Sequence, residues 1–133
     1  MNGFSADVIS ILKHCNMCHT SSYGVVLGGT SIEDGKNVYD YLSQLGLRVA
    51  SGYMKHISMW DYIIIPRKQS SVRRLVEALT SLNSLGIIIV ETTGTDAKIE
   101  ERYSNVNSQL SATRVVYEDR SYLVVHTGNE YGN

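Results

Sequence analysis

The chain has 133 residues, with 12 basic and 13 acidic side chains and a formal charge of -1 at neutral pH. That length suits one domain able to fold without disulfides or a structural metal, and the near-neutral charge gives no clear signal for nucleic-acid binding, which usually needs a strong positive balance. Apolar runs are far shorter than the ~20 residues of a membrane helix, and the first residues lack the features of a signal peptide, so we expect a cytoplasmic protein with no membrane partner.

The first half of the chain is predicted to begin with an amphipathic helix. Apolar residues recur at helical spacing over 5–14, and a polar loop leads to an aliphatic strand at 23–27. A glycine turn then precedes a helical pattern that Gly46 stops, and residues 47–50 follow as a short second strand. The N-terminal segment, 1–22, is thus predicted to contain a helix and a loop with the Cys/His residues. A strand, a turn, a helix and a second strand follow it.

The second half contains the most informative stretch. Asp61 to Ile65 and Gly86 to Glu91 are runs rich in β-branched residues without polar alternation, which predicts strands buried on both faces of a sheet. We expect a helix between them, from Ser70 to Leu85, and a more polar helix over 97–110. Residues 113–117 and 121–126 then predict an antiparallel hairpin, followed by a flexible tail over 127–133.

Strands and helices therefore alternate along most of the chain, joined by short connections that glycines mark. This order predicts an α/β fold with a single domain over residues 1–133. The expected architecture is a Rossmann-like three-layer sandwich, in which a mostly parallel sheet ends in a C-terminal antiparallel hairpin. Ligands of such sheets bind beyond the strand ends. The candidate cofactor-binding residues are therefore the first glycine turn and two strand-end carboxylates: Gly28, Gly29, Thr30, Ser31, Asp61 and Glu91.

Two segments, 61–66 and 76–90, resemble part of Rossmann-like class I S-adenosylmethionine-dependent methyltransferases. They are similar to that family's fourth strand, the helix after it and the fifth strand, and the closing hairpin extends the resemblance over roughly the C-terminal half. The resemblance implies a methyltransferase-like domain whose cofactor would be S-adenosylmethionine, with another nucleotide as the alternative.

Several features of that family are absent from this sequence. The first turn has two glycines in place of a full glycine-rich loop, and the segment 47–52, which contains the second strand, lacks the carboxylate that would hold the ribose hydroxyls. Residues 65–68 keep one proline of the family's catalytic tetrapeptide, and a third strand is missing between Gly52 and Trp60. These departures favour a non-catalytic binding or interaction subunit, with an S-adenosylmethionine- or nucleotide-binding enzyme as the alternative.

Both cysteines fall in one short motif, residues 14–19. Its C-x-x-C-H spacing is that of covalent haem attachment, although such proteins are exported before they receive haem. His14, Cys15, Cys18 and His19 could instead bind zinc with help from a distant ligand, or the two thiols could form a reversible disulfide. The remaining interpretation is two half-buried thiols in a polar loop.

Two surface features complete the set of candidates. Arg67, Lys68, Arg73 and Arg74 follow the first of the two central strands, and they could meet a phosphate or an acidic partner or form a solvated helix face. The chain also has nine tyrosines against one phenylalanine. Because tyrosine is favoured at interfaces, this composition is consistent with a homodimer or another protein partner.

Overall fold

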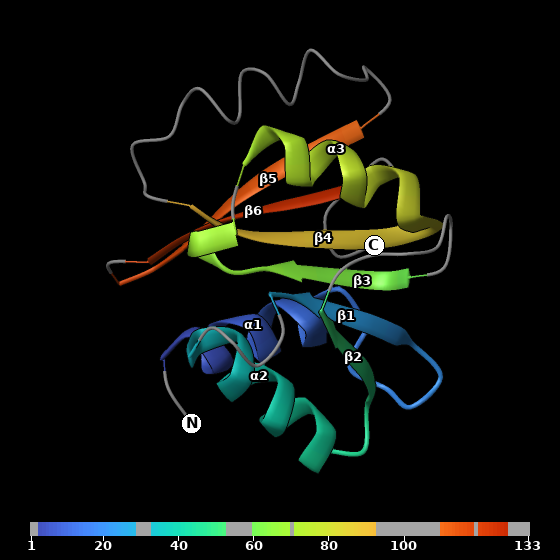
Figure 1. Cartoon of the computed structure of the whole chain (residues 1–133), viewed down its shortest axis with the longest axis vertical. Coiled ribbons are helices and arrows are strands. Elements are labelled where there is room, and N and C mark those ends of the chain that lie inside the picture. The colour runs from blue at the N-terminus through green and yellow to red at the C-terminus, as the bar shows by residue number, and fades with distance from the viewer. Residues whose placement is uncertain are drawn as a thin grey trace.

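The computed structural model describes residues 3–28, 33–52, 60–69, 71–92, 110–118 and 120–127. Six strands form one mixed sheet with helices on both faces (Figure 1), which confirms the predicted α/β class. In chain order the elements are α1 (Gly3–His14), β1 (Tyr23–Leu27), α2 (Glu33–Gln44), β2 (Arg48–Gly52), β3 (Trp60–Ile65), the 3-10 helix η2 (Arg67–Gln69), α3 (Val72–Ser81), β4 (Leu82–Thr92), β5 (Leu110–Tyr117) and β6 (Arg120–Thr127).

The strand order is β2-β1-β3-β4-β6-β5. Strands β2, β1, β3 and β4 are parallel, and β6 lies antiparallel between β4 and β5, as the predicted hairpin requires. The chain runs from β1 outward to β2 and then returns to the other side of β1 for β3. The topological switch point therefore lies between β1 and β3, the place where open α/β sheets bind their ligands.

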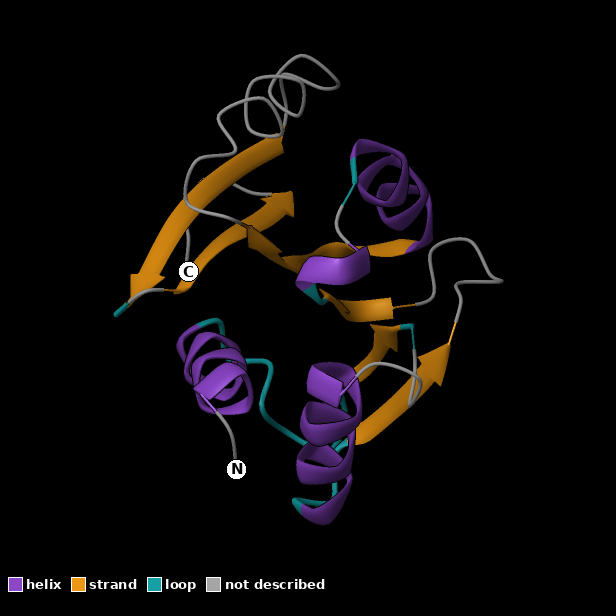
Figure 2. Cartoon of the chain, turned by 60° about the vertical axis from the view of Figure 1, so that its left-hand side comes forward, coloured by secondary structure: helices purple, strands orange, loops and turns teal. Residues whose placement is uncertain are grey.

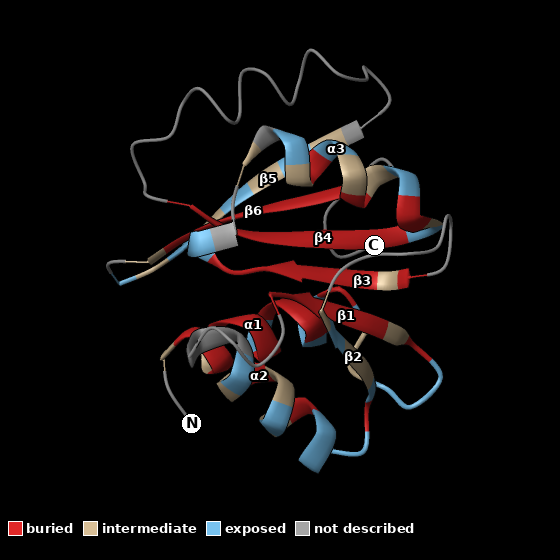
Figure 3. Ribbon diagram, viewed as in Figure 1, coloured by how far each residue is buried: buried red, intermediate tan, exposed pale blue. Residues whose placement is uncertain are grey.

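Alternate residues along the strands face opposite layers of the molecule. Ile64 and Ile89 pack in the cluster formed with α1 and α2, whereas Ile63 and Ile88 pack with Leu75 of α3. Figure 2 shows α1 and α2 on one side of the sheet and α3 on the other, and Figure 3 shows the central strands buried along most of their length. The uninterrupted β-branched runs therefore reflect burial on both faces, as predicted.

Local signals explain several element ends. Ser71 is the N-cap of α3, where its side-chain oxygen accepts the backbone N–H of Arg74 at 3.1 Å. Gly46 follows α2 with a φ of 81°, a conformation that favours glycine and ends the helix. Strand β1 coincides with the predicted 23–27. Among the described residues, no helix is long and apolar enough to cross a lipid bilayer.

The largest correction concerns the end of α3. The helix predicted over 70–85 ends at Ser81, and β4 begins at Leu82. Leu82 pairs with Trp60 of β3 and its side chain is buried, so pairing with the sheet replaces the last helical turn. Leu85, in contrast, is 79% exposed. The β3–β4 register shifts near this point, which lets the extra residues join the strand.

Some predicted segments lie outside the described residues. These are the turn residues 29–31, the connection at 53–59 where the family's third strand would stand, and most of the helix over 97–110. Leu110, the last residue of that predicted helix, instead begins β5, and Thr127 still belongs to β6.

Candidate functional site

The carboxyl ends of the parallel strands meet at one edge of the sheet, on the left in Figure 1. β1 leads to Gly28, β2 ends at Gly52, β3 leads to Pro66 and β4 reaches Glu91 close to its end. The β1–β3 register, extended past Leu27, places Gly28 opposite Pro66. This set of strand ends, called the carboxyl edge below, therefore brings together two of the predicted site residues, Gly28 and Glu91.

Two glycines with positive φ form the backbone of the carboxyl edge at β1 and β2. Gly28 has a φ of 81° and Gly52 a φ of 122°, values that residues with a Cβ rarely adopt. The Gly28 N–H donates a hydrogen bond to the Gly52 carbonyl oxygen at 3.2 Å. A Cβ built on Gly52 would meet no atom of the described chain within 4 Å. The end of β2 thus presents bare backbone where the family would carry a carboxylate.

Glu91 holds the turn that follows β3. Its side chain is buried, and its Oε1 accepts the backbone N–H of Arg67 at 3.0 Å. The sequence predicted Glu91 at a strand end as a candidate cofactor-binding residue. In the structure, Glu91 binds the backbone of the turn that follows the neighbouring strand β3. This carboxylate therefore fixes the position of η2 against β4.

Asp61 lies at the other end of the sheet. One carboxylate oxygen accepts the backbone N–H of Tyr23 at 2.8 Å, and the other accepts the side-chain amide of Asn83 at 2.9 Å. These bonds tie the starts of β1 and β4 to the start of β3. The structure therefore does not bring Asp61 together with Gly28 and Glu91, and it gives Asp61 a role in sheet assembly.

A buried polar cluster lies beside the carboxyl edge and was not foreseen from the sequence. Asp7 of α1 accepts hydrogen bonds from Arg120 Nε and from the Tyr122 hydroxyl, both at 2.6 Å. Tyr122 is fully buried and pairs with Glu91 across β4 and β6. Burial, followed by the hydrogen bond to Asp7, raises the pKa of Tyr122 far above its usual value. The hydrogen bond to Asp7 also raises the pKa of Arg120.

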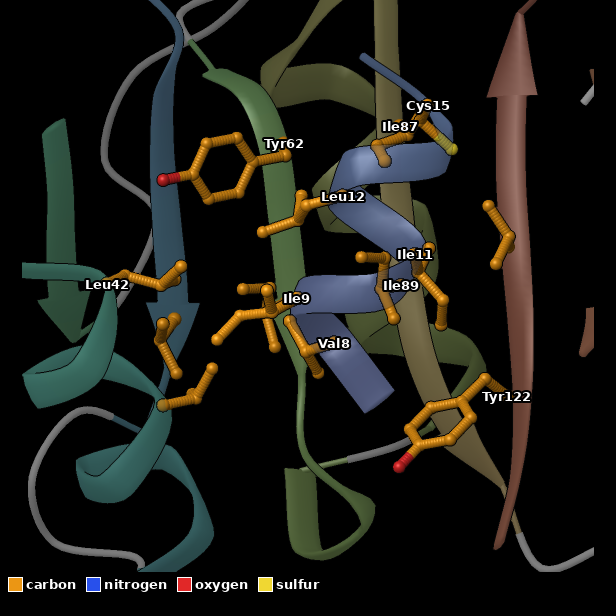
Figure 4. Close-up of a cluster of buried hydrophobic side chains, with 14 of the residues drawn as sticks. Val8, Ile9, Ile11, Leu12, Cys15, Leu42, Tyr62, Ile87, Ile89 and Tyr122 are labelled. Carbon is orange, nitrogen blue, oxygen red and sulfur yellow. The ribbon is translucent and has the colours of Figure 1, made fainter. Parts of the chain in front are cut away.

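A signal for this cluster was present in the helix pattern. Asp7 falls on the same helical face as Phe4, Val8 and Ile11, which are buried against the sheet. A carboxylate in an apolar stripe indicates a buried partner, because an unpaired charge there would be costly. The partners come from the distant strand β6, and Figure 4 shows Tyr122 reaching toward the layer that α1 forms.

The four residues of the Cys/His motif do not gather around one point. Cys15 belongs to the core cluster that includes α1 (Figure 4), Cys18 is half-buried, and no disulfide joins the two cysteines. His19 is exposed, with its Nδ1 at 2.7 Å from the Ser21 hydroxyl. Within the described ranges, no three His, Cys, Asp or Glu side chains form a group that could hold a metal ion, so His14, Cys15, Cys18 and His19 are not arranged as a zinc site. Cys15 is thus more buried than the sequence predicted, whereas Cys18 is half-buried.

The four basic residues after β3 divide into two pairs. Arg73 and Arg74 of α3 both bond to Glu77, each at 3.3 Å. Arg67 and Lys68 of η2 are exposed, and neither side chain has an ion-pair partner in the part of the chain that the structure describes. The second pair lies at the carboxyl edge, directly after Pro66.

Several solved methyltransferases have a similar fold. The plantazolicin methyltransferase BpumL, in complex with a triazolic desmethylPZN analogue and SAH, matches with a TM-score of 0.65 and 8% identity over 96% of this chain and 86% of its own. Phosphoethanolamine N-methyltransferase 2 from Haemonchus contortus was solved in complex with phosphomonomethylethanolamine and S-adenosylhomocysteine. It matches with a TM-score of 0.63 and 13% sequence identity over 95% of this chain. An rRNA methylase from Streptococcus thermophilus matches with a TM-score of 0.56 and 10% sequence identity, over 90% of this chain and 94% of its own.

These likenesses establish the fold. The chain spans 38% of the length of the Haemonchus contortus enzyme, and the identities are 13% or lower. No family model matches the sequence, and no curated protein does so either. The chain thus has the Rossmann-like fold of class I methyltransferases, as the C-terminal half of the sequence predicted.

Proposed function

We propose that this chain binds S-adenosylmethionine, or another ligand containing adenosine, at the carboxyl edge beside the switch point between β1 and β3. The observation that carries this proposal is the pair formed by Gly28 and Gly52. Both have positive φ, they are joined by a hydrogen bond, and they end adjacent strands. Backbone without side chains lets a flat nucleoside approach closely, and the switch point is where such ligands bind in this class of sheet.

The shared fold supports the choice of an adenosyl ligand, since BpumL and the Haemonchus contortus enzyme were both solved with S-adenosylhomocysteine. Affinity should be weaker than in an enzyme that has the ribose-binding carboxylate. A hydrogen bond to a charged group contributes about 1.5–3 kcal/mol. Because Gly52 has no carboxylate to accept such a bond from the ribose, the ligand affinity should be weaker by about tenfold or more.

A second candidate function is a non-catalytic interaction subunit, and one observation favours it. Glu91 is the carboxylate that β4 brings to the carboxyl edge, and it is buried with Oε1 bonded to the Arg67 backbone. A carboxylate used in this way is poorly placed to serve as a catalytic base. The two candidates differ in one measurable respect, which is whether the chain takes up the ligand.

Isothermal titration calorimetry of the full chain with S-adenosylmethionine and S-adenosylhomocysteine separates the candidates. Saturable binding with one site supports the proposed function. Absence of binding to both ligands, in a chain that is folded by circular dichroism, contradicts it and leaves the interaction subunit.

A matched pair of variants locates the site. Gly28 and Gly46 both have a φ of 81°, but Gly46 follows α2 and precedes the start of β2, at the other end of that strand. Gly28→Ala and Gly46→Ala should therefore carry a similar backbone strain of about 1–3 kcal/mol. We expect ligand affinity to fall only in the Gly28 variant. Equal affinity in both variants would show that the ligand binds elsewhere.

A further inference from the structure

We propose that the carboxyl edge has a second subsite, in which Arg67 and Lys68 bind the phosphate group of a small phosphomonoester. The inference rests on the proposed function, because the subsite lies beside the strand end to which we assign the nucleoside. It is carried by three features of the described residues: the place of η2, the way its turn is fixed, and the distribution of charge around it.

The place of η2 follows from the sheet register. The β1–β3 register, extended by two residues beyond Val26, places Gly28 opposite Pro66, and η2 begins at the next residue, Arg67. In Figure 1, η2 stands at the same edge as the end of β1. A group bound by Arg67 and Lys68 would therefore lie close to a ligand seated on the backbone of Gly28.

The turn that carries the two cations is fixed on both sides. Pro66 has a restricted φ and follows the fully buried Ile65. Immediately after it, the Arg67 N–H is bonded to the carboxylate of Glu91, a residue that is itself only 7% exposed. Because both anchors restrict the backbone of the turn, less backbone entropy is lost when a ligand binds Arg67 and Lys68.

The two cations of η2 differ from those of α3 in their ion pairs. The neighbouring Arg73 and Arg74 share Glu77, so their charges are partly neutralised. Arg67 and Lys68 have no such carboxylate among the described residues, and Glu91 is directed at the backbone. The carboxyl edge therefore has two exposed cations, Arg67 and Lys68, beside the buried carboxylate of Glu91.

A guanidinium and an ammonium together have the charge that one phosphate monoester requires. A guanidinium can donate two parallel hydrogen bonds to phosphate oxygens, and an ammonium adds a compact charge. Together they balance a group that carries close to two negative charges. A nucleic-acid strand would instead need cations along many successive phosphates, and the chain has 12 basic against 13 acidic residues.

The test uses the full chain and glycerol 2-phosphate, with glycerol as the uncharged control. We expect saturable shifts of the backbone amide signals of residues 67–69 with glycerol 2-phosphate and none with glycerol. In the double variant R67Q/K68Q the affinity should fall by about tenfold or more. The matched double variant R73Q/R74Q removes the same number of positive charges from α3. Its affinity for glycerol 2-phosphate should stay within about twofold of that of the parent chain. Equal losses in the two variants would overturn the inference.

Two further titrations separate this inference from other outcomes. A chain that binds S-adenosylmethionine but not glycerol 2-phosphate refutes the phosphate subsite alone, and the reverse result refutes the proposed function alone. A single-stranded RNA of about ten nucleotides tests the nucleic-acid alternative. The inference would also be overturned if the chain bound the RNA more tightly than glycerol 2-phosphate and if R73Q/R74Q weakened RNA binding as much as R67Q/K68Q.

Discussion

Replacing Asp7 with alanine should destabilise the chain by about 2–4 kcal/mol. The Asp7 side chain is 8% exposed, and its Oδ2 accepts hydrogen bonds from both Tyr122 and Arg120. The substitution leaves the fully buried Tyr122 hydroxyl without this acceptor, which costs about 1–3 kcal/mol. The Arg120 side chain is 31% exposed, so water replaces part of the lost interaction and its share is about 1 kcal/mol.

A double-mutant cycle tests the assignment. Tyr122→Phe removes the hydroxyl that Asp7 binds, so the D7A/Y122F variant should be less destabilised than the sum of the two single variants, by about 1–2 kcal/mol. Urea unfolding can be followed by the fluorescence of Trp60, the one tryptophan of the chain, which is 5% exposed. A D7A variant within about 0.5 kcal/mol of the parent chain, or additive single effects, would refute this reasoning.

Three further predictions concern the core and the amino end of the sheet. Gly24→Ala should cost about 2–4 kcal/mol in thermal unfolding, because a Cβ there would lie 1.8 Å from a ring carbon of Tyr62. Burial lowers the pKa of His126, so the unfolded chain binds a proton that the folded chain does not, and stability should fall as pH drops below about 6.5. His126→Gln should reduce that pH dependence. Asp61→Ala should cost about 2–3 kcal/mol, and Asp61→Asn, which keeps one acceptor, about half as much.

Each of these predictions has an outcome that contradicts it. An unchanged melting temperature in Gly24→Ala would mean that the Tyr62 ring has another low-energy position. A pH profile that is the same in His126→Gln as in the parent chain would assign the acid sensitivity to other groups. Equal stability of the Ala and Asn variants at Asp61 would show that its hydrogen bonds to β1 and β4 contribute little.

Some elements could be predicted closely because their signals are local. β1 is an aliphatic run between a polar loop and Gly28, and its predicted and observed bounds agree. The end of α3 could not be predicted in this way. Leu82 and Leu85 are compatible with a longer helix, but Leu82 pairs with Trp60 in the structure. Nothing in the local sequence reveals such a contact, since the partner strand lies earlier in the chain.

The candidate site was predictable in part for the same reason. Gly28 and Glu91 stand at strand ends that the sequence marks clearly, and both lie at the carboxyl edge. Gly52 was noted only as a missing carboxylate, because a positive φ cannot be inferred from one glycine. Asp61 also stands at a strand end, but at the amino end, where its partners are a backbone N–H and the amide of Asn83.

The contact between Asp7 and Tyr122 also constrains the order in which the chain can fold. The two residues are 115 positions apart, so during synthesis α1 emerges long before its hydrogen-bond partner on β6. The parallel strands β1 to β4 can pair while the rest of the chain is still being made, but the Asp7 carboxylate gains its buried donor only after Tyr122 has left the ribosome. Helix α1 can therefore pack against β1 to β4 early, but it completes its buried hydrogen bonds only after β6 has been made.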